Sequence, residues 1–144
     1  MKKFLTIEER DSVLCGLRGV WGFGLLGTES EKVVGFKLSE IEKILGHDWF
    51  VKSLTDRGVQ LLYEIEDTYS EEDANLDLYK NYLVSPNELR VWRSEDLLSR
   101  DVIWTSESFD WVVFVSGNEF LNVGGWMLER LKATLPDWKN LGKW

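Results

Sequence analysis

The chain has 144 residues, one cysteine, one histidine and a formal net charge of −8. This length suits a single globular domain over residues 1–144, with a core that needs no disulfide. The acidic balance argues against nucleic-acid binding, which requires clustered Lys and Arg, and no stretch approaches the roughly 18 apolar residues of a membrane span. Polar residues 6–11 also interrupt any signal peptide, so we expect a cytoplasmic protein without membrane contact.

The N-terminal residues predict a helix. Thr6 followed by Glu9 forms a capping-box pattern, and apolar residues recur at helical spacing up to about Arg18. We expect Cys15 to be a small buried residue of this helix rather than a nucleophile. Residues 22–27 match G-x-G-x-x-G, but polar residues follow them where a dinucleotide site needs a helix. We therefore interpret them as a loop or an irregular edge strand.

The next segment predicts a strand and two short helices. The strand covers residues 33–36, and Ser39 is expected to be the N-cap of a helix that ends near Gly46. Asp48 is expected to cap a helix over 49–57, closed by Gly58. His47 would then be a polar residue of the connecting loop.

A longer strand is predicted over residues 59–68, with alternate residues on one face. Further along, Ser85 and Pro86 open either a short helical turn or a strand over 89–92. Another strand is predicted at 102–105, and a helix over 126–135 is stopped by Pro136. In the strand predicted over 59–68, the residues expected on one face are Val59, Leu61, Tyr63 and Ile65.

Residues 110–123 predict a central β-hairpin. Gly117-Asn118 suits a two-residue type II′ turn, which would pair Val115 with Phe120 and Val113 with Asn122. Apolar residues occupy both faces, so the hairpin should be covered on both sides. The expected faces are Val112, Phe114, Leu121 and Val123 on one side, and Trp111, Val113, Val115 and Phe120 on the other. The sequence thus predicts an α+β fold, with a mainly antiparallel sheet packed against N-terminal and C-terminal helices.

The sequence contains no recognisable catalytic or metal-binding pattern. A Ser-His-Asp set would have to use His47, and no G-x-S-x-G accompanies it. One Cys and one His cannot form a structural zinc site. Asp73-Ala74-Asn75-Leu76-Asp77 resembles the start of a calcium loop, but the glycine and glutamate required later in that loop are replaced by Leu78 and Val84. We expect no catalytic residue, cofactor or metal.

The acidic stretch from Glu64 to Asp77, which has all four tyrosines of the chain in or beside it, is the best candidate site. Tyrosine is common in interface hot spots, and carboxylates around it would steer a basic protein partner. In overall character the chain resembles small acidic bacterial immunity proteins and nuclease inhibitors, although no motif carries the resemblance and no residue role is transferred. We expect a non-enzymatic protein that blocks a basic partner. The predicted contacts are Tyr63, Glu64, Glu66, Asp67, Tyr69, Glu71, Glu72 and Asp73.

An alternative function follows from the eight tryptophans. Several of them could line an apolar pocket that binds a small molecule or, together with His47, forms an enzyme site. The candidate pocket residues are Trp21, Trp49, Trp92, Trp104 and Trp111.

Overall fold

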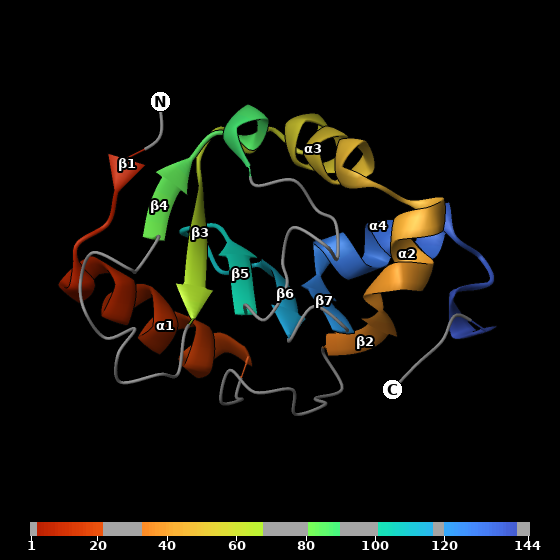
Figure 1. Cartoon of the computed structure of the whole chain (residues 1–144), viewed down its shortest axis with the longest axis horizontal. Helices are drawn as coiled ribbons and strands as arrows, with labels where there is room; N and C mark the ends of the chain where they lie inside the picture. The colour runs from red at the N-terminus through yellow and green to blue at the C-terminus, as the bar shows by residue number, and fades with distance from the viewer. Residues whose placement is uncertain (1–2, 22–32, 68–80, 90–100, 117–119, 141–144) are drawn as a thin grey trace.

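The computed structural model describes residues 3–21, 33–67, 81–89, 101–116 and 120–140, and the statements below concern these ranges (Figure 1). They form a seven-stranded antiparallel sheet in the order β1-β4-β3-β5-β6-β7-β2. The strands are β1 (Lys3–Phe4), β2 (Val33–Lys37), β3 (Leu62–Asp67), β4 (Asn81–Val84), β5 (Asp101–Thr105), β6 (Trp111–Ser116) and β7 (Phe120–Gly125). The helices are α1 (Ile7–Trp21), α2 (Leu38–Ile44), α3 (His47–Asp56) and α4 (Trp126–Thr134), with short 3-10 turns η3 (Pro86–Glu88) and η4 (Trp138–Asn140).

Helices cover both faces of the sheet. Helix α1 packs on one face through Val13, Leu14 and Leu17, which contact side chains of β3, β5 and β6. Helices α2, α3 and α4 cover the other face, where the larger core cluster lies (Figure 1). The predicted α+β fold, with a mainly antiparallel sheet and a central hairpin between N-terminal and C-terminal helices, is confirmed. None of the described helices has the length and apolar character needed to cross a membrane.

The start of α1 confirms the predicted capping box. The Glu9 backbone N–H donates to Thr6 Oγ1 at 3.1 Å, and the Thr6 N–H donates to Glu9 Oε1 at 3.1 Å. Cys15, however, is exposed, so the prediction that it is buried is wrong. The helix turns its Val13, Leu14 and Leu17 side toward the sheet, and Cys15 lies on the other side.

Helices α2 and α3 begin earlier than the sequence suggested. Their N-caps are Lys37 and Gly46, so Ser39 and Asp48 lie inside the first turns instead of capping them. Strand β2 runs directly into α2, which leaves no loop residue to serve as a cap. His47 is the first residue of α3 rather than a loop residue, and it is half-buried. Asp48 still lies near the N-terminal end of the helix dipole, where a carboxylate is favourable.

The β6–β7 hairpin is confirmed, but its predicted register is wrong by one residue. Val113 pairs with Val123 and Val115 with Leu121, so three residues, 117–119, separate Ser116 from Phe120. These residues lie outside the described ranges, and so does the Gly117-Asn118 turn. A one-residue slip moves the side chains of one strand to the opposite face. Leu121 and Val123 therefore join the core under α2–α4, together with Val113.

Strand β3 begins at Leu62, later than predicted, because residues after Gly58 form the connection from α3. Gly58 closes α3 with a φ of +83°. Leu62 is buried and Leu61 is exposed, which reverses the expected alternation at the start of this strand. The helical interpretation of Ser85–Glu88 is confirmed, since Glu88 Oε1 accepts hydrogen bonds from the Ser85 N–H at 3.0 Å and from Ser85 Oγ at 2.9 Å. The G-x-G-x-x-G segment lies outside the described residues.

Candidate functional site

Two of the predicted partner contacts lie in the interior. Glu64 and Glu66 are fully buried, because with Leu62 they lie on the sheet face that α2–α4 cover. Glu64 Oε1 accepts a hydrogen bond from Trp104 Nε1 at 3.0 Å. Both glutamates therefore support the core rather than meeting a partner, which corrects the sequence-based assignment. The remaining side chains of the predicted set, apart from Tyr63, lie outside the described residues: Asp67, Tyr69, Glu71, Glu72 and Asp73.

The tryptophans proposed for a pocket mostly fill the core. Trp104 and Trp111 are fully buried, and their rings lie 5.6 and 6.1 Å from that of Phe50. Trp21 is buried and Trp49 is half-buried against the core, while Trp92 lies outside the described residues. The four described rings, those of Trp21, Trp49, Trp104 and Trp111, therefore stabilise the fold and do not line either groove described below.

A groove between α1, β3 and the β5–β6 turn carries several carboxylates. We call it the acidic groove. It has a volume of about 580 Å³, and the described residues of its lining include three glutamates and no Lys or Arg. Glu8 and Glu9 come from the first turn of α1, and Glu107 comes from the turn formed by residues 106–110. The lining residues are Glu8, Glu9, Ser12, Val13, Gly16, Tyr63, Glu107 and Phe109.

Tyr63 is the one member of the predicted set that reaches this groove. Its side chain is half-buried on the α1 side of β3. Burial raises the pKa of the phenol, and the carboxylates of Glu107 and Glu9 raise it further. The phenol is therefore neutral at physiological pH, and the negative charges of both glutamates act on it.

Phe109 forms the other aromatic wall of the acidic groove. Its backbone has a φ of 55°, in the left-handed region, and its half-buried ring packs against Gly16 of α1. A side chain at residue 16 would overlap this ring, so the glycine allows the turn to approach the helix closely. The groove thus depends on contacts between segments about 90 residues apart in sequence.

A second groove lies on the other side of the same turn, and we call it the Arg57 groove. It has a volume of about 520 Å³ and shares Glu107 with the acidic groove. The Arg57 guanidinium carbon lies 5.0 Å from the centre of the Trp126 ring. The Trp126 ring in turn lies 5.7 Å from that of Trp111. The lining residues are Arg57, Gly58, Val59, Leu61, Ser106, Glu107, Ser108, Asp110 and Trp126.

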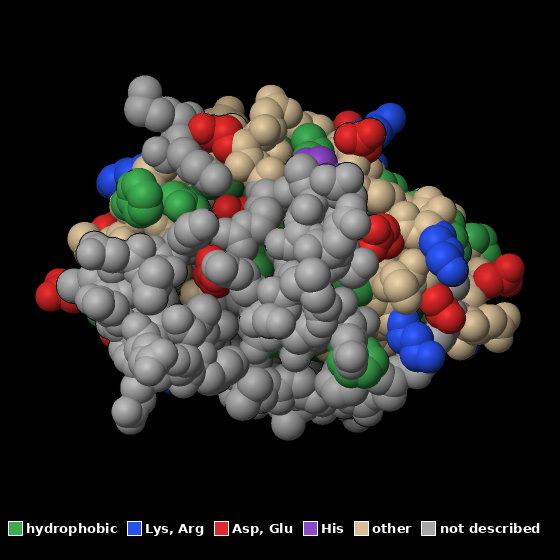
Figure 2. Space-filling view, viewed as in Figure 1, with side chains coloured by type: hydrophobic (Ala, Val, Ile, Leu, Met, Phe, Trp, Pro, Cys, Tyr) green, Lys and Arg blue, Asp and Glu red, His purple; other side chains and the backbone are tan. Residues whose placement is uncertain are grey.

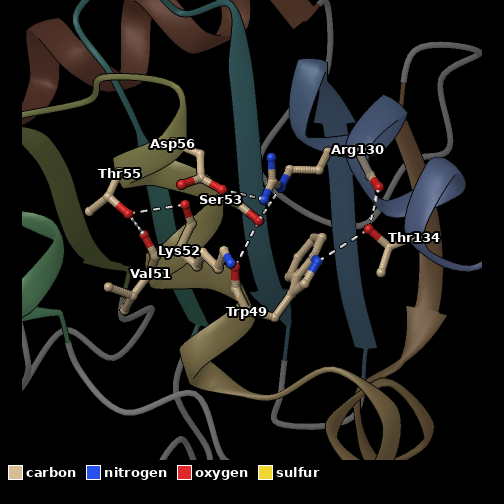
Figure 3. Close-up of polar contacts among 8 residues, drawn as sticks. All are labelled: Trp49, Val51, Lys52, Ser53, Thr55, Asp56, Arg130 and Thr134. Carbon is tan, nitrogen blue, oxygen red and sulfur yellow. Dashed lines mark hydrogen bonds and ion pairs between the residues drawn. The ribbon is translucent and has the colours of Figure 1, made fainter.

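Polar contacts join α3, which ends just before Arg57, to α4, which begins at Trp126 (Figure 3). Arg130 of α4 donates from Nε to Ser53 Oγ at 2.7 Å and forms an ion pair with Asp56 at 2.9 Å. Trp49 Nε1 donates to Thr134 Oγ1 at 3.3 Å. These contacts join the two helices just before Arg57, so the position of Arg57 is tied to that of α4.

Sequence reasoning missed most of these groove residues. Glu8 and Glu9 have an evident local role at a helix start, and Glu107 belongs to a short connection between strands. No sequence spacing reveals that they converge, because the sheet topology brings them together.

Charged side chains are arranged differently elsewhere on the surface. On the face shown in Figure 2, acidic and basic side chains are interspersed near α2 and α4, at the right of the view.

No group of three potential metal ligands occurs within the described ranges. His47, the one histidine of the chain, lines neither groove. The comparisons do not add a functional assignment: no known protein family, no curated protein and no solved structure matches the chain.

Proposed function

We propose that this chain is a non-enzymatic binding protein of the immunity or inhibitor type. It blocks a basic protein partner when a segment of that partner binds in the acidic groove. The observation that carries the proposal is the convergence of Glu8, Glu9 and Glu107 around Tyr63, with no Lys or Arg among the lining residues that the structure describes. This groove takes over the role that the sequence suggested for Glu64 and Glu66.

The proposed recognition combines long-range attraction with local packing. A net charge of −8 attracts a basic protein and raises its association rate at low ionic strength. Within the groove, the carboxylates pair with ammonium or guanidinium groups, while Tyr63 and Phe109 offer ring faces and edges for a guanidinium to pack against. A partner whose active site must attract phosphate would carry such groups, and occupying that site would block its activity.

The groove can be tested with an amidated hexa-arginine peptide as the probe. We expect Glu8→Gln combined with Glu107→Gln to weaken binding by roughly 2- to 25-fold at low salt, since an exposed charge pair contributes about 0.2–1 kcal/mol. The matched control is Asp48→Asn combined with Asp137→Asn, two exposed carboxylates outside both grooves. Both double variants change the net charge equally, from −8 to −6. Dissociation constants come from calorimetric titration.

Two further readouts test the peptide's location and the electrostatics of the groove. Amide chemical shifts of the wild-type protein should change on titration at Gly16, Tyr63 and Phe109. In the Glu107→Gln protein without peptide, the pKa of the Tyr63 phenol should fall toward its ordinary value, because one of the charges that raise it is gone. Equal weakening in both double variants would show attraction by net charge alone and would contradict the proposal, as would a complete absence of peptide binding.

A further inference from the structure

We infer that Arg57 receives a carboxylate of the same partner, so that the recognised segment carries basic groups on one side of the 106–110 turn and an acidic group on the other. The inference rests on the proposed function and specifies the partner chemistry more closely. Its basis is that the groove containing Arg57 and the acidic groove flank one turn and share Glu107.

Arg57 is available for an ion pair. Its side chain is exposed. Among the described residues, the guanidinium contacts the face of the Trp126 ring, with its central carbon 5.0 Å from the ring centre. Arg130, the neighbouring arginine, is already paired with Asp56 at 2.9 Å. A guanidinium that lies on a ring keeps its N–H groups in its own plane, where they can hold a carboxylate through two parallel hydrogen bonds.

The position of Arg57 is prepared by the surrounding structure. It is the C-cap of α3, and Gly58 turns the chain away with a φ of +83°. The hydrogen bonds from α4 to Ser53 and Asp56 hold the last turns of α3, and Trp111 supports Trp126 from within the core. Fewer side-chain conformations are then lost when a ligand binds, which favours affinity.

The remaining charges of the Arg57 groove select a single carboxylate over a multiply charged anion. Glu107 and Asp110 line the same groove, so the described part of its lining carries one positive and two negative charges. An isolated phosphate dianion would be repelled by both carboxylates. A carboxylate in a segment that also carries basic groups meets Arg57, while its basic neighbours meet Glu107 and the acidic groove.

The test uses peptides that differ by one charge. Each has three arginines, a spacer of one to four glycines, and either Glu or Gln before a C-terminal amide. We expect the Glu peptide to bind the wild-type protein about 1.5- to 5-fold more tightly than its Gln counterpart at the best spacer length. Attraction by net charge alone predicts the reverse, because the protein is negative and the Gln peptide is the more positive one.

Replacement of Arg57 completes the test. Arg57→Gln should abolish the preference for Glu, while Arg18→Gln, the same charge change at an exposed α1 residue outside both grooves, should preserve it. If all peptides bind but Gln equals or exceeds Glu at every spacer length, the inference is overturned and the proposed function stands. The inference is also overturned if Arg18→Gln abolishes the preference. If no peptide binds, the proposed function fails and the inference fails with it.

Discussion

Individual glycines show how strongly backbone geometry constrains this fold. Gly125, at the junction of β7 and α4, has a φ of +72°, and a side chain there would overlap the backbone of Asp110 and Trp111. The Trp126 N–H donates to the Asp110 carbonyl at 3.4 Å across the same junction. Gly19, in α1, is exposed, and a methyl group added there would meet no other atom within 4 Å. The same substitution should therefore have opposite effects at the two residues.

We predict that Gly125→Ala lowers the free energy of unfolding by at least about 2 kcal/mol, since it combines left-handed strain with a backbone overlap. Gly19→Ala should raise it by up to about 1 kcal/mol, because alanine favours a helix. Urea unfolding followed by circular dichroism measures both values. A neutral Gly125→Ala variant would show that the turn and the α4 start are not in close contact.

At the scale of elements, two local capping patterns were predicted correctly, those at Ser39 and Asp48 were not, and the long-range contacts were not predicted. The capping box of Thr6 and Glu9 and the turn at Ser85 and Glu88 involve residues three apart, so their sequence pattern determines their contacts. The β6–β7 register depends on the number of turn residues, and Gly117-Asn118 indicated two where the pairing leaves three. The two grooves join α1, α3, α4 and the β5–β6 turn, a convergence that only the sheet topology creates.

The α3–α4 contact provides a test at this scale. We predict that Arg130→Met and Ser53→Ala show a coupling of about 0.5–1 kcal/mol in a double-mutant cycle, because Arg130 Nε donates to Ser53 Oγ at 2.7 Å. The cycle requires urea unfolding of the wild-type protein, the two single variants and the double variant. Additive effects would mean that the hydrogen bond between Arg130 and Ser53 does not contribute to the stability of this contact.

For the whole molecule, the sheet covered on both faces explains why buried residues cluster so strongly in the strands. The α+β composition and the covered hairpin followed from apolar residues on both faces of residues 111–123, a pattern that requires no long-range knowledge. The burial of Glu64 and Glu66 did not follow, because charged residues in a strand usually indicate a face in water. The ionisable groups that line the grooves or cap helices lie at the periphery of the sheet and its covering helices.

Two of these peripheral carboxylates make the free energy of unfolding depend on pH in the acidic range. Hydrogen bonds from the Thr6 and Ser85 backbones hold the pKa values of Glu9 and Glu88 below their usual range. A carboxyl group whose pKa is lowered in the folded state stabilises that state at pH values above its ordinary pKa of 4.5. This contribution is lost as the pH falls through the lowered pKa. We predict that Glu9→Gln combined with Glu88→Gln loses less stability than the wild type between about pH 4.5 and pH 2. Urea midpoints across this range provide the measurement, and identical pH profiles would contradict the prediction.

Phe109 has an implication for how this protein can change over evolution. It is the one residue other than glycine, in the part of the chain that the structure describes, with a positive φ. Glycine or asparagine would relieve backbone strain of about 1–3 kcal/mol at that position, so retention of an aromatic ring there opposes the local energetic preference. Because the ring fits against Gly16, descendants that keep the groove should conserve both residues, and lineages that lose it should be free to change both together.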